Sequence, residues 1–344
     1  MTSPPDRIRT ILGPGSMMKI GWILLAAVAV APLLGLGAYP LHLMIVALIW
    51  SYIYTSWAIM GRLGLVSFGH CAFLGVGAYS VVLAWNLLGW SPWFGGVVGI
   101  AATLVIAFLI GWPCFRFKIV GHYFAVVTLA SAEIVRLVIM ALRDQTGGSL
   151  GITPRPALAD NATVSLSALQ FSSKVVWFYI ALCVWLAGLV VWRWVDRSMA
   201  RLALLAISEE EEAAASIGIN ISRVKMAIML LSAGMTAFGG MLYAQYQCYI
   251  NPETVSSLTV SLQIVFGVIA GGMFVMLGPT VGAIFLLALS ETLRVVIGSQ
   301  SRGIDQLIYG AMLILFIIYM PTGILGKWFE RVRGRRGGAG SRAV

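Results

Sequence analysis

Long apolar runs separated by short polar segments make up most of this chain. Ten of the runs are long enough to cross roughly 30 Å of hydrocarbon as helices. We expect these helices at 19–36, 41–60, 68–88, 93–112, 121–141, 175–195, 226–247, 258–276, 278–298 and 304–322. The pattern therefore predicts an all-α, polytopic membrane protein with about ten transmembrane helices and a membrane domain at 19–325.

Composition leads to the same class. The chain has 344 residues, of which 60% are hydrophobic and 10% are charged, and this is more apolar surface than a soluble core of this size encloses. The net charge of +10 raises the alternative of a nucleic-acid partner. However, the Lys and Arg lie between the apolar runs and at the termini, which is typical of topology signals in a protein surrounded by membrane lipid.

The basic residues also predict the orientation, because Lys and Arg are retained in cytoplasmic loops. With the N-terminus inside, the inner segments and the adjoining helix ends hold 17 of the 23 Lys and Arg. Both termini are then cytoplasmic, as an even number of spans requires. The cytoplasmic parts are the N-terminal segment 1–18, the loop 196–225 and the basic tail 326–344, whereas the Gly-, Pro- and Ser-rich segment 142–174 is an external loop.

The cytoplasmic loop contains the sequence EEEEAAASIGI at 209–219. Helical spacing of its apolar residues predicts two short helices, with the glutamates spread around one turn near a helix start and Gly218 ending the second helix. One reading is a solvated, acidic helix end. The other uses the order Glu212-Ala213-Ala214-x-x-x-Gly218, in which small residues let another protein approach the backbone and the glycine permits a sharp turn.

This order resembles the EAA loop of ABC importer permeases, in which a coupling helix sits in a cleft of the ATPase subunit. Further stretches are similar, in the same order, to the LivM-type permease subunits of branched-chain amino acid ABC transporters. They are GRLGLVSFGHCAFLGVGAYS at 61–80, GHYFAVVTLASAEIVRLV at 121–138, TGGSLGI at 146–152 and GGMFVMLGPTVGA at 271–283. The similarity runs from about residue 40 to residue 325.

The resemblance implies a set of partners. These are a second, LivH-like permease subunit in a heterodimer, two cytoplasmic ATPase subunits, and a periplasmic or external substrate-binding protein. It also implies a bacterial inner-membrane location, ATP and Mg used on the ATPase subunits, and no cofactor on this chain. The cargo stays open, because the family includes permeases for urea and short amides besides amino acids.

The absence of catalytic motifs agrees with a transport subunit rather than an enzyme. Gly326-Lys327 is followed by Trp328 and lacks the upstream glycine of a phosphate-binding loop. The sequence also has no HExxH, no nucleophile elbow and no Cys/His cluster for a metal. The competing class is an ion-coupled secondary transporter, which needs mid-span carboxylates, and only Glu133 and Glu291 are available, each near an arginine.

Those carboxylates belong to two similar pairs. Glu133 and Arg136 lie three residues apart, and Glu291 and Arg294 repeat the spacing, so each pair can meet on one helix face. The contexts SAEIVRLVI and LSETLRVVI suggest an internal repeat of spans three to six with seven to ten. The pairs either line the substrate path as gates or tie helices together near the outer interface.

The glycine-rich segment 61–80 supplies further path candidates. Irregular or closely packed backbone at membrane depth lies beside protein or a water-filled cavity, so the segment either lines the translocation path or forms a small-residue packing seam. Glycine pairs at 95 and 99 and at 278 and 282 have the spacing of close helix crossings. The candidate path residues are Ser67, His70, Tyr123, Thr128 and Gln245.

Overall fold

The computed structural model describes residues 37–156, 164–165 and 168–297, together with a few isolated positions. Eight of the ten predicted spans fall within these ranges, apart from residue 298. The spans expected at 19–36 and 304–322, like the segments 1–18 and 326–344, lie outside the described residues except for isolated positions. The expectation that both termini are cytoplasmic therefore stays a prediction.

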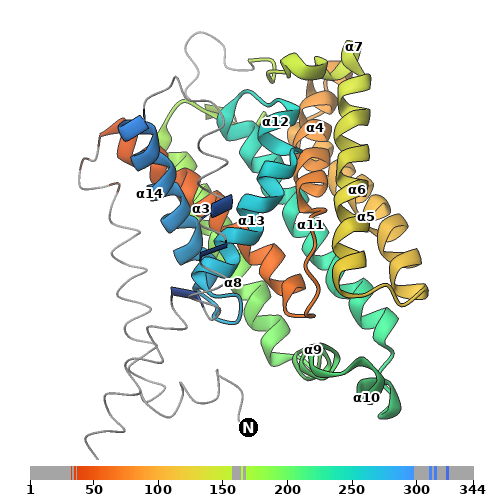
Figure 1. Ribbon diagram of the computed structural model, residues 1–344. Helices are drawn as coiled ribbons and strands as arrows, with labels where there is room; N and C mark the ends of the chain where they lie inside the picture. The colour runs from red at the N-terminus through yellow and green to blue at the C-terminus, as the bar shows by residue number, and fades with distance from the viewer. Residues whose placement is uncertain are drawn as a thin grey trace, which may run out of the picture.

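Within the described ranges the chain is a bundle of long helices (Figure 1). Seven helices, counting 252–271 as one, are long and apolar enough to cross a membrane, and a shorter apolar helix covers 278–293. This confirms an all-α, multi-span membrane protein, although it does not test the number of ten spans. The long helices are α3 (Ala38–Gly61), α4 (His70–Leu88), α5 (Pro92–Arg116), α6 (Gly121–Ala141), α8 (Lys174–Arg197), α11 (Ile221–Gln247), α13 (Leu258–Gly271) and α14 (Gly278–Ile297).

The connecting segments gather at the two ends of the bundle. One end carries α7 (Arg143–Thr146), the 3₁₀ turn η2 (Gly148–Leu150), the antiparallel strands β1 (Val164–Ser165) and β2 (Gln170–Phe171), and α12 (Pro252–Val255). The other end carries α9 (Ala200–Glu209) and α10 (Glu211–Ser216). Figure 1 shows α7 and α10 at opposite ends, so the loops predicted to be external and cytoplasmic do lie at opposite ends of the bundle.

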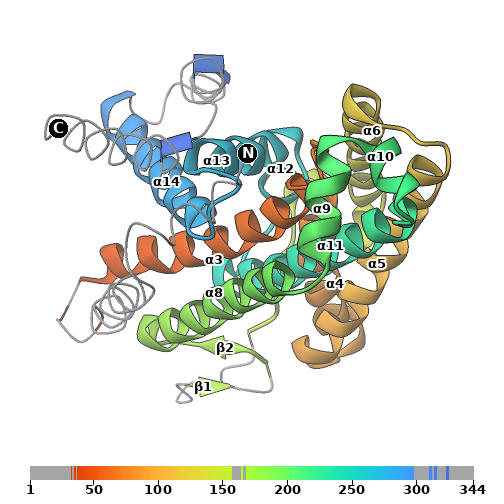
Figure 2. The same ribbon diagram turned by 90° about the horizontal axis from the view of Figure 1, so that it is seen from below.

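Burial differs strongly between helices. Of the most apolar stretch of each helix, 83% of the residues are buried in α3 but only 22% in α6. Figure 2 shows why, because α3 runs between α8 on one side and α13 and α14 on the other. In contrast, α6 lies at the edge of the bundle and leaves much of its surface uncovered.

Glycines set the closest helix crossings. A Cβ on Gly77 of α4 would lie 2.2 Å from the carbonyl oxygen of Ala237 in α11, and a Cβ on Gly240 would lie 2.2 Å from that of Leu74. Such separations are inside van der Waals contact, so α4 and α11 cross backbone to backbone.

The predicted glycine pairs are confirmed as packing positions. Gly95 and Gly99 of α5 face α4, where a Cβ on either would lie within 3 Å of a side-chain carbon. A Cβ on Gly282 of α14 would lie 1.8 Å from the carbonyl oxygen of Gly267 in α13. The predicted span 258–276 is corrected here, because α13 ends at Gly271, before Gly272 with a φ of +113°.

Candidate functional site

The glutamate run lies across a break between two helices. Glu209 ends α9, Glu210 is extended with a φ of −157°, and Glu211 and Glu212 begin α10. The expectation of four glutamates spread around one helical turn is therefore wrong, because the backbone turns at Glu210. The expected end of α10 is confirmed, since Gly218 follows it with a φ of +89°.

The helix α10 has a buried side and an exposed side. Ala214 is 1% exposed and packs in the core of this chain, whereas Ile217 is 74% exposed. Glu212, Ala213 and Gly218 are exposed as well. Of the four residues matched to the coupling pattern, three therefore face outward and Ala214 faces the bundle.

An ion pair attaches α10 to the long helix α11. The Lys225 ammonium donates to the Glu211 carboxylate, and Lys225 is only 2% exposed. The Lys225 ammonium also lies 6.0 Å from the centre of the Phe115 ring in α5. This contact was not predicted from the sequence, because a run of glutamates suggests solvated residues and Lys225 lies 14 positions away from Glu211, beyond the Gly218 turn.

A second ion pair braces the same end of the molecule. The Arg62 guanidinium lies 2.5 Å from the Asp196 carboxylate and 4.7 Å from the centre of the Trp192 ring. This joins the end of α3 to the end of α8, beside the start of α9. The charged contact of α10 is thus with α11, and the buried Leu204 and Ile207 of α9 pack in the core.

The candidate path residues of 61–80 are buried among helices. Ser67 is 1% exposed, its carbonyl accepts from the Trp57 indole at 2.8 Å, and its hydroxyl accepts from the Gly69 amide. Thr128 of α6 is also buried, and its hydroxyl accepts from the Phe68 amide at 3.1 Å. Such contacts are expected if segment 61–80 is a small-residue packing seam between helices.

His70 takes part in a buried chain of hydroxyl contacts. Its Nε2 lies 2.7 Å from the Ser232 hydroxyl, which donates to the Ser56 carbonyl at 2.7 Å. The Ser56 hydroxyl in turn lies 2.7 Å from that of Thr236. Because Ser232 has a single hydroxyl proton, Nε2 of His70 is the donor in this arrangement. The network links α3, α4 and α11 in the core.

The remaining two path candidates lie elsewhere. Tyr123 is 79% exposed on α6, near the end that carries α10. Gln245 of α11 is 1% exposed, and both its amide oxygen and its amide nitrogen lack hydrogen-bond partners among the described residues. Within those residues, no hydrogen bond joins either of them to Ser67, His70 or Thr128, so the path role of all five stays a prediction.

The Glu133–Arg136 pair forms as predicted and extends further. Arg136 donates to Glu133 at 2.5 Å on α6 and to Glu253 of α12 at 2.8 Å. The guanidinium thus connects α6 to α12. This agrees with the hypothesis that such ion pairs hold helices together near the outer interface. Sequence reasoning missed Glu253, because it lies in the short helix α12, 117 positions away.

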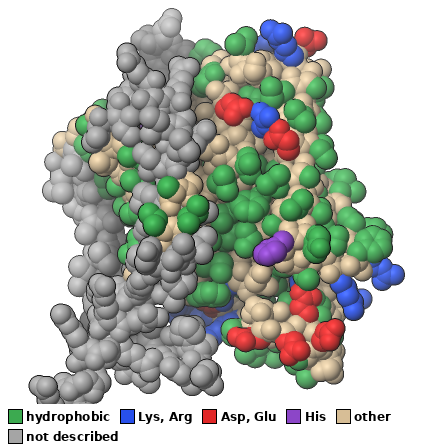
Figure 3. All heavy atoms as spheres, viewed as in Figure 1, with side chains coloured by type: hydrophobic (Ala, Val, Ile, Leu, Met, Phe, Trp, Pro, Cys, Tyr) green, Lys and Arg blue, Asp and Glu red, His purple; other side chains and the backbone are tan. Residues whose placement is uncertain are grey.

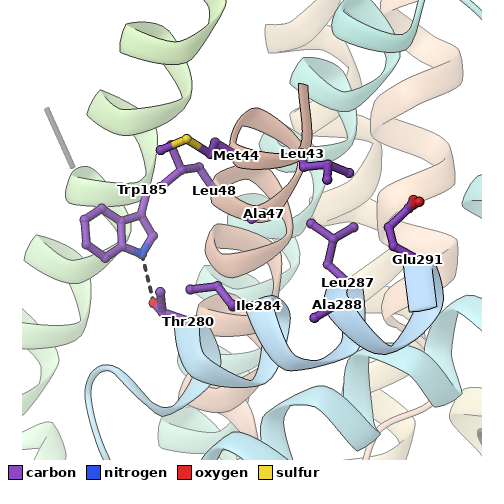
Figure 4. Close-up of a pocket in the computed structure, with 10 residues that line it drawn as sticks. All are labelled: Leu43, Met44, Ala47, Leu48, Trp185, Thr280, Ile284, Leu287, Ala288 and Glu291. Atoms are coloured by element: carbon purple, nitrogen blue, oxygen red, sulfur yellow. Dashed lines mark hydrogen bonds between the residues drawn. The ribbon is translucent and has the colours of Figure 1, made fainter. Parts of the chain in front are cut away.

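The second Glu–Arg pair has different surroundings. Glu291 of α14 accepts a hydrogen bond from the Tyr39 hydroxyl at 2.6 Å, and the Arg294 side chain lies outside the described part, so that pair stays a prediction. Glu291 also borders an apolar pocket of about 350 Å³ between α3, α8 and α14 (Figure 4). In this pocket the Trp185 indole donates to the Thr280 hydroxyl at 2.9 Å.

Metal chemistry has no support in the part of the chain that the structure describes. Nowhere in that part do three or more His, Cys, Asp or Glu side chains gather in a group able to hold an ion. The candidate functional surfaces are the exposed side of α10 and the charged edge of α6.

Comparison with known proteins identifies the family. Residues 39–317 match the profile described as "Branched-chain amino acid transport system / permease component". This chain belongs to that family of transport permeases. No solved structure matches the chain significantly.

The similar proteins are permease subunits of two kinds, LivM and LivH. The chain is 28% identical over 303 residues to the LivM permease protein of the high-affinity branched-chain amino acid transport system of Escherichia coli K12, covering 82% of this chain and 68% of LivM. The match to LivM of Salmonella typhimurium, also at 28% identity, covers 78% and 65%. LivH of E. coli K12 is 25% identical over 277 residues, covering 78% of this chain and 88% of LivH.

Proposed function

We propose that this chain is the membrane-spanning subunit of an ABC importer that moves branched-chain or other amino acids across a bacterial inner membrane. A periplasmic or external binding protein delivers the amino acid at the end that carries α7. Two cytoplasmic ATPase subunits bind at the α10 end and consume ATP with Mg, while this chain holds neither. Closure of the ATPases then moves α10 and rocks the long helices between outward- and inward-open arrangements.

The observation that carries this proposal is the construction of α10. It is a short helix at one end of the bundle that exposes Glu212, Ala213 and Ile217 while Ala214 is buried. An exposed isoleucine beside small residues suits insertion into a groove of a partner protein. Because Lys225 ties α10 to α11, a push on α10 reaches a helix that crosses the whole bundle.

The second permease subunit is proposed from the comparisons. The chain is similar both to LivM and to LivH, so two related chains sharing this fold would pack around an approximate twofold axis. The uncovered surface of α6 suits that interface. Ionic side chains there would meet protein or water rather than lipid, as intramembrane charges require.

The cargo is inferred from the relatives, which are permease proteins of branched-chain amino acid transport systems. Urea and short amides are the second candidate for the same transporter class. An aliphatic cargo favours a path that is mostly apolar and weakly selective, with recognition left to the binding protein.

A purification and a competition assay test the proposal. A tag on this chain in its own host should recover a second permease, two ATPase subunits and, with ligand present, a binding protein. In vesicles made from that complex, leucine, isoleucine and valine should compete with labelled leucine, whereas urea and acetamide should not. Recovery of the chain without any ATPase would overturn the proposal, and competition by urea alone would change the cargo.

A further inference from the structure

A cavity on the α6 side of the bundle has no role in the contacts considered so far. It has a volume of about 240 Å³ and is lined by residues of α4, α6 and the turn from α12 into α13. This is smaller than the roughly 300–1,000 Å³ usual for sites of drug-sized ligands, so it suits a small molecule. Its lining residues are Cys71, Leu129, Ala132, Glu133, Ser256 and Leu258.

The cavity is apolar inside and charged where it opens. Cys71 and Ala132 are buried, while Leu258 is 42% exposed and the Glu133 side chain is 41% exposed. Apart from Ser256 and Glu133, every lining side chain is apolar or a thiol. A ligand entering from the exposed side would therefore bury an aliphatic group and leave a polar group beside Glu133.

Ser256 is the polar group on the inner wall. It is 1% exposed, and its hydroxyl has no hydrogen-bond partner among the described residues. That hydroxyl fits only because residue 75 is glycine, since a Cβ there would lie 1.8 Å from it. Buried hydroxyls without a partner are uncommon, and this one marks a polar point on the otherwise apolar inner wall.

The charges at the opening can accommodate a zwitterion. Arg136 stands between Glu133 and Glu253, and Figure 3 shows acidic side chains flanking a basic one on a face otherwise rich in hydrophobic side chains. An α-amino acid placed here would set its ammonium on Glu133 and its carboxylate on Arg136, while Arg136 keeps Glu253. Every charge then stays paired, which a low-dielectric site requires.

We infer that this cavity is a binding subsite for an aliphatic α-amino acid, with the side chain in the pocket of α4, α6 and α13 and the backbone charges on Glu133 and Arg136. The inference rests on the proposed function and deepens it by assigning a place on this chain to the substrate.

Thiol labelling tests the subsite without ATP and without the binding protein. The complex is purified from its host through a tag on this chain carrying Leu258→Cys, with the exposed Cys183 and Cys248 replaced by serine. The probe is a water-soluble maleimide. With leucine at about ten times its Kd the site is about 90% occupied, so labelling should slow about tenfold. Leu262→Cys, one turn along α13, 38% exposed and outside the cavity lining, is the control and should label at an unchanged rate.

Ligand analogues and a filled cavity complete the test. Isoamylamine and 4-methylpentanoate each lack one of the two charges and should protect Leu258→Cys much less than leucine does. Adding Ala132→Leu should abolish the protection, whereas Ala101→Leu on the exposed side of α5 should retain it. If Ala132→Leu fails to fold, Glu133→Gln serves instead and should also lose protection.

The outcomes separate the subsite from the proposed function. No protection by leucine, or equal protection at Leu262→Cys, would overturn the subsite even if ATP-driven leucine uptake is measured. Equal protection by isoamylamine would overturn the zwitterion assignment. Protection at Leu258→Cys in a complex that shows no ATP-dependent uptake would uphold the subsite and overturn the proposed function.

Discussion

The crossing of α4 with α11 and the outer surface of α6 differ in how completely this chain buries them. At the crossing, Gly77 and Gly240 bring two backbones together, and 61% of the apolar stretch is buried in each helix. On α6 the corresponding share is 22%, and charged side chains are left at the surface. The crossing is complete within a single chain, whereas α6 requires something further to cover it.

The exposed part of α10 belongs with α6 in this comparison. Both surfaces are exposed in the isolated chain, and both carry charged side chains beside apolar ones. Of the predicted path residues, His70 belongs with the crossing, where its Nε2 meets Ser232 of α11. Ser67 and Thr128 are buried elsewhere, beside the loop that precedes α4. We therefore expect substitutions at the crossing to alter folding and substitutions on α6 and α10 to alter assembly and transport.

The largest effect is expected at the crossing. Gly240→Ala places a Cβ 2.2 Å from the Leu74 carbonyl oxygen, so the helices must move apart at a cost of about 1–3 kcal/mol. Gly234→Ala on the same helix meets only ordinary contacts, the nearest at 3.6 Å, and should be neutral or stabilising by up to about 1 kcal/mol. Thermal unfolding of the two variants in detergent measures the difference, and equal midpoints would remove the distinction between crossing and surface.

A slightly smaller effect is expected at the buried side of α10. Ala214→Leu overpacks a site that is 1% exposed and should cost about 1–2 kcal/mol, because the short surface helix can shift. Trypsin cleavage within 196–225 should accelerate as a result. If cleavage is unchanged while ATPase binding is lost, Ala214 contacts the partner rather than this chain.

A comparable loss of binding, without loss of stability, is expected on the exposed side of α10. Ile217→Glu places a charge at the proposed contact and should weaken ATPase association about tenfold, or about 1.4 kcal/mol. The unfolding free energy should change by no more than about 0.5 kcal/mol, as for other surface changes. Leu150→Glu, 70% exposed at the opposite end, is the control, and an equal loss with that variant would exclude a specific docking face.

The smallest effect concerns the link between α6 and α12. Glu253 is 68% exposed at its side chain, so Glu253→Gln should lower the unfolding free energy by less than about 1 kcal/mol. Glu212→Gln at the other end should change it even less. A loss of several kcal/mol on Glu253→Gln would mean that the ion pair holds the bundle together and that the α6 edge is structural.

The sequence predicted the helices well and their faces poorly. The apolar run at 121–141 coincides with α6, because span length depends only on local hydrophobicity. In contrast, α3 and α4 are apolar on all sides, so no periodicity indicates which side meets another helix and which meets a path. His70 and Ser67 could be placed in the core only after α11 and α3 were placed around them.

Contacts between residues far apart in the sequence could not be predicted either, because they depend on how the helices are arranged. Glu211 and Lys225 meet because Gly218 reverses the chain, and Glu253 reaches Arg136 from a separate helix. Two short helices were predicted here, but the position of the break at Glu210 was not, because helix propensity alone favours continuing through a run of glutamate and alanine. The outward-facing Glu212, Ala213 and Gly218 were found because their order is a local pattern.

We propose that transport through this chain is driven by ATPases docked on α10. Uptake of leucine into proteoliposomes is the most direct test of this proposal. The tagged complex is reconstituted with labelled leucine and binding protein outside, with or without Mg-ATP inside. We expect leucine to accumulate against a gradient only when both Mg-ATP and binding protein are present, and we expect this accumulation to be lost with Ile217→Glu. Equal accumulation without ATP would contradict it and indicate an ion-coupled transporter.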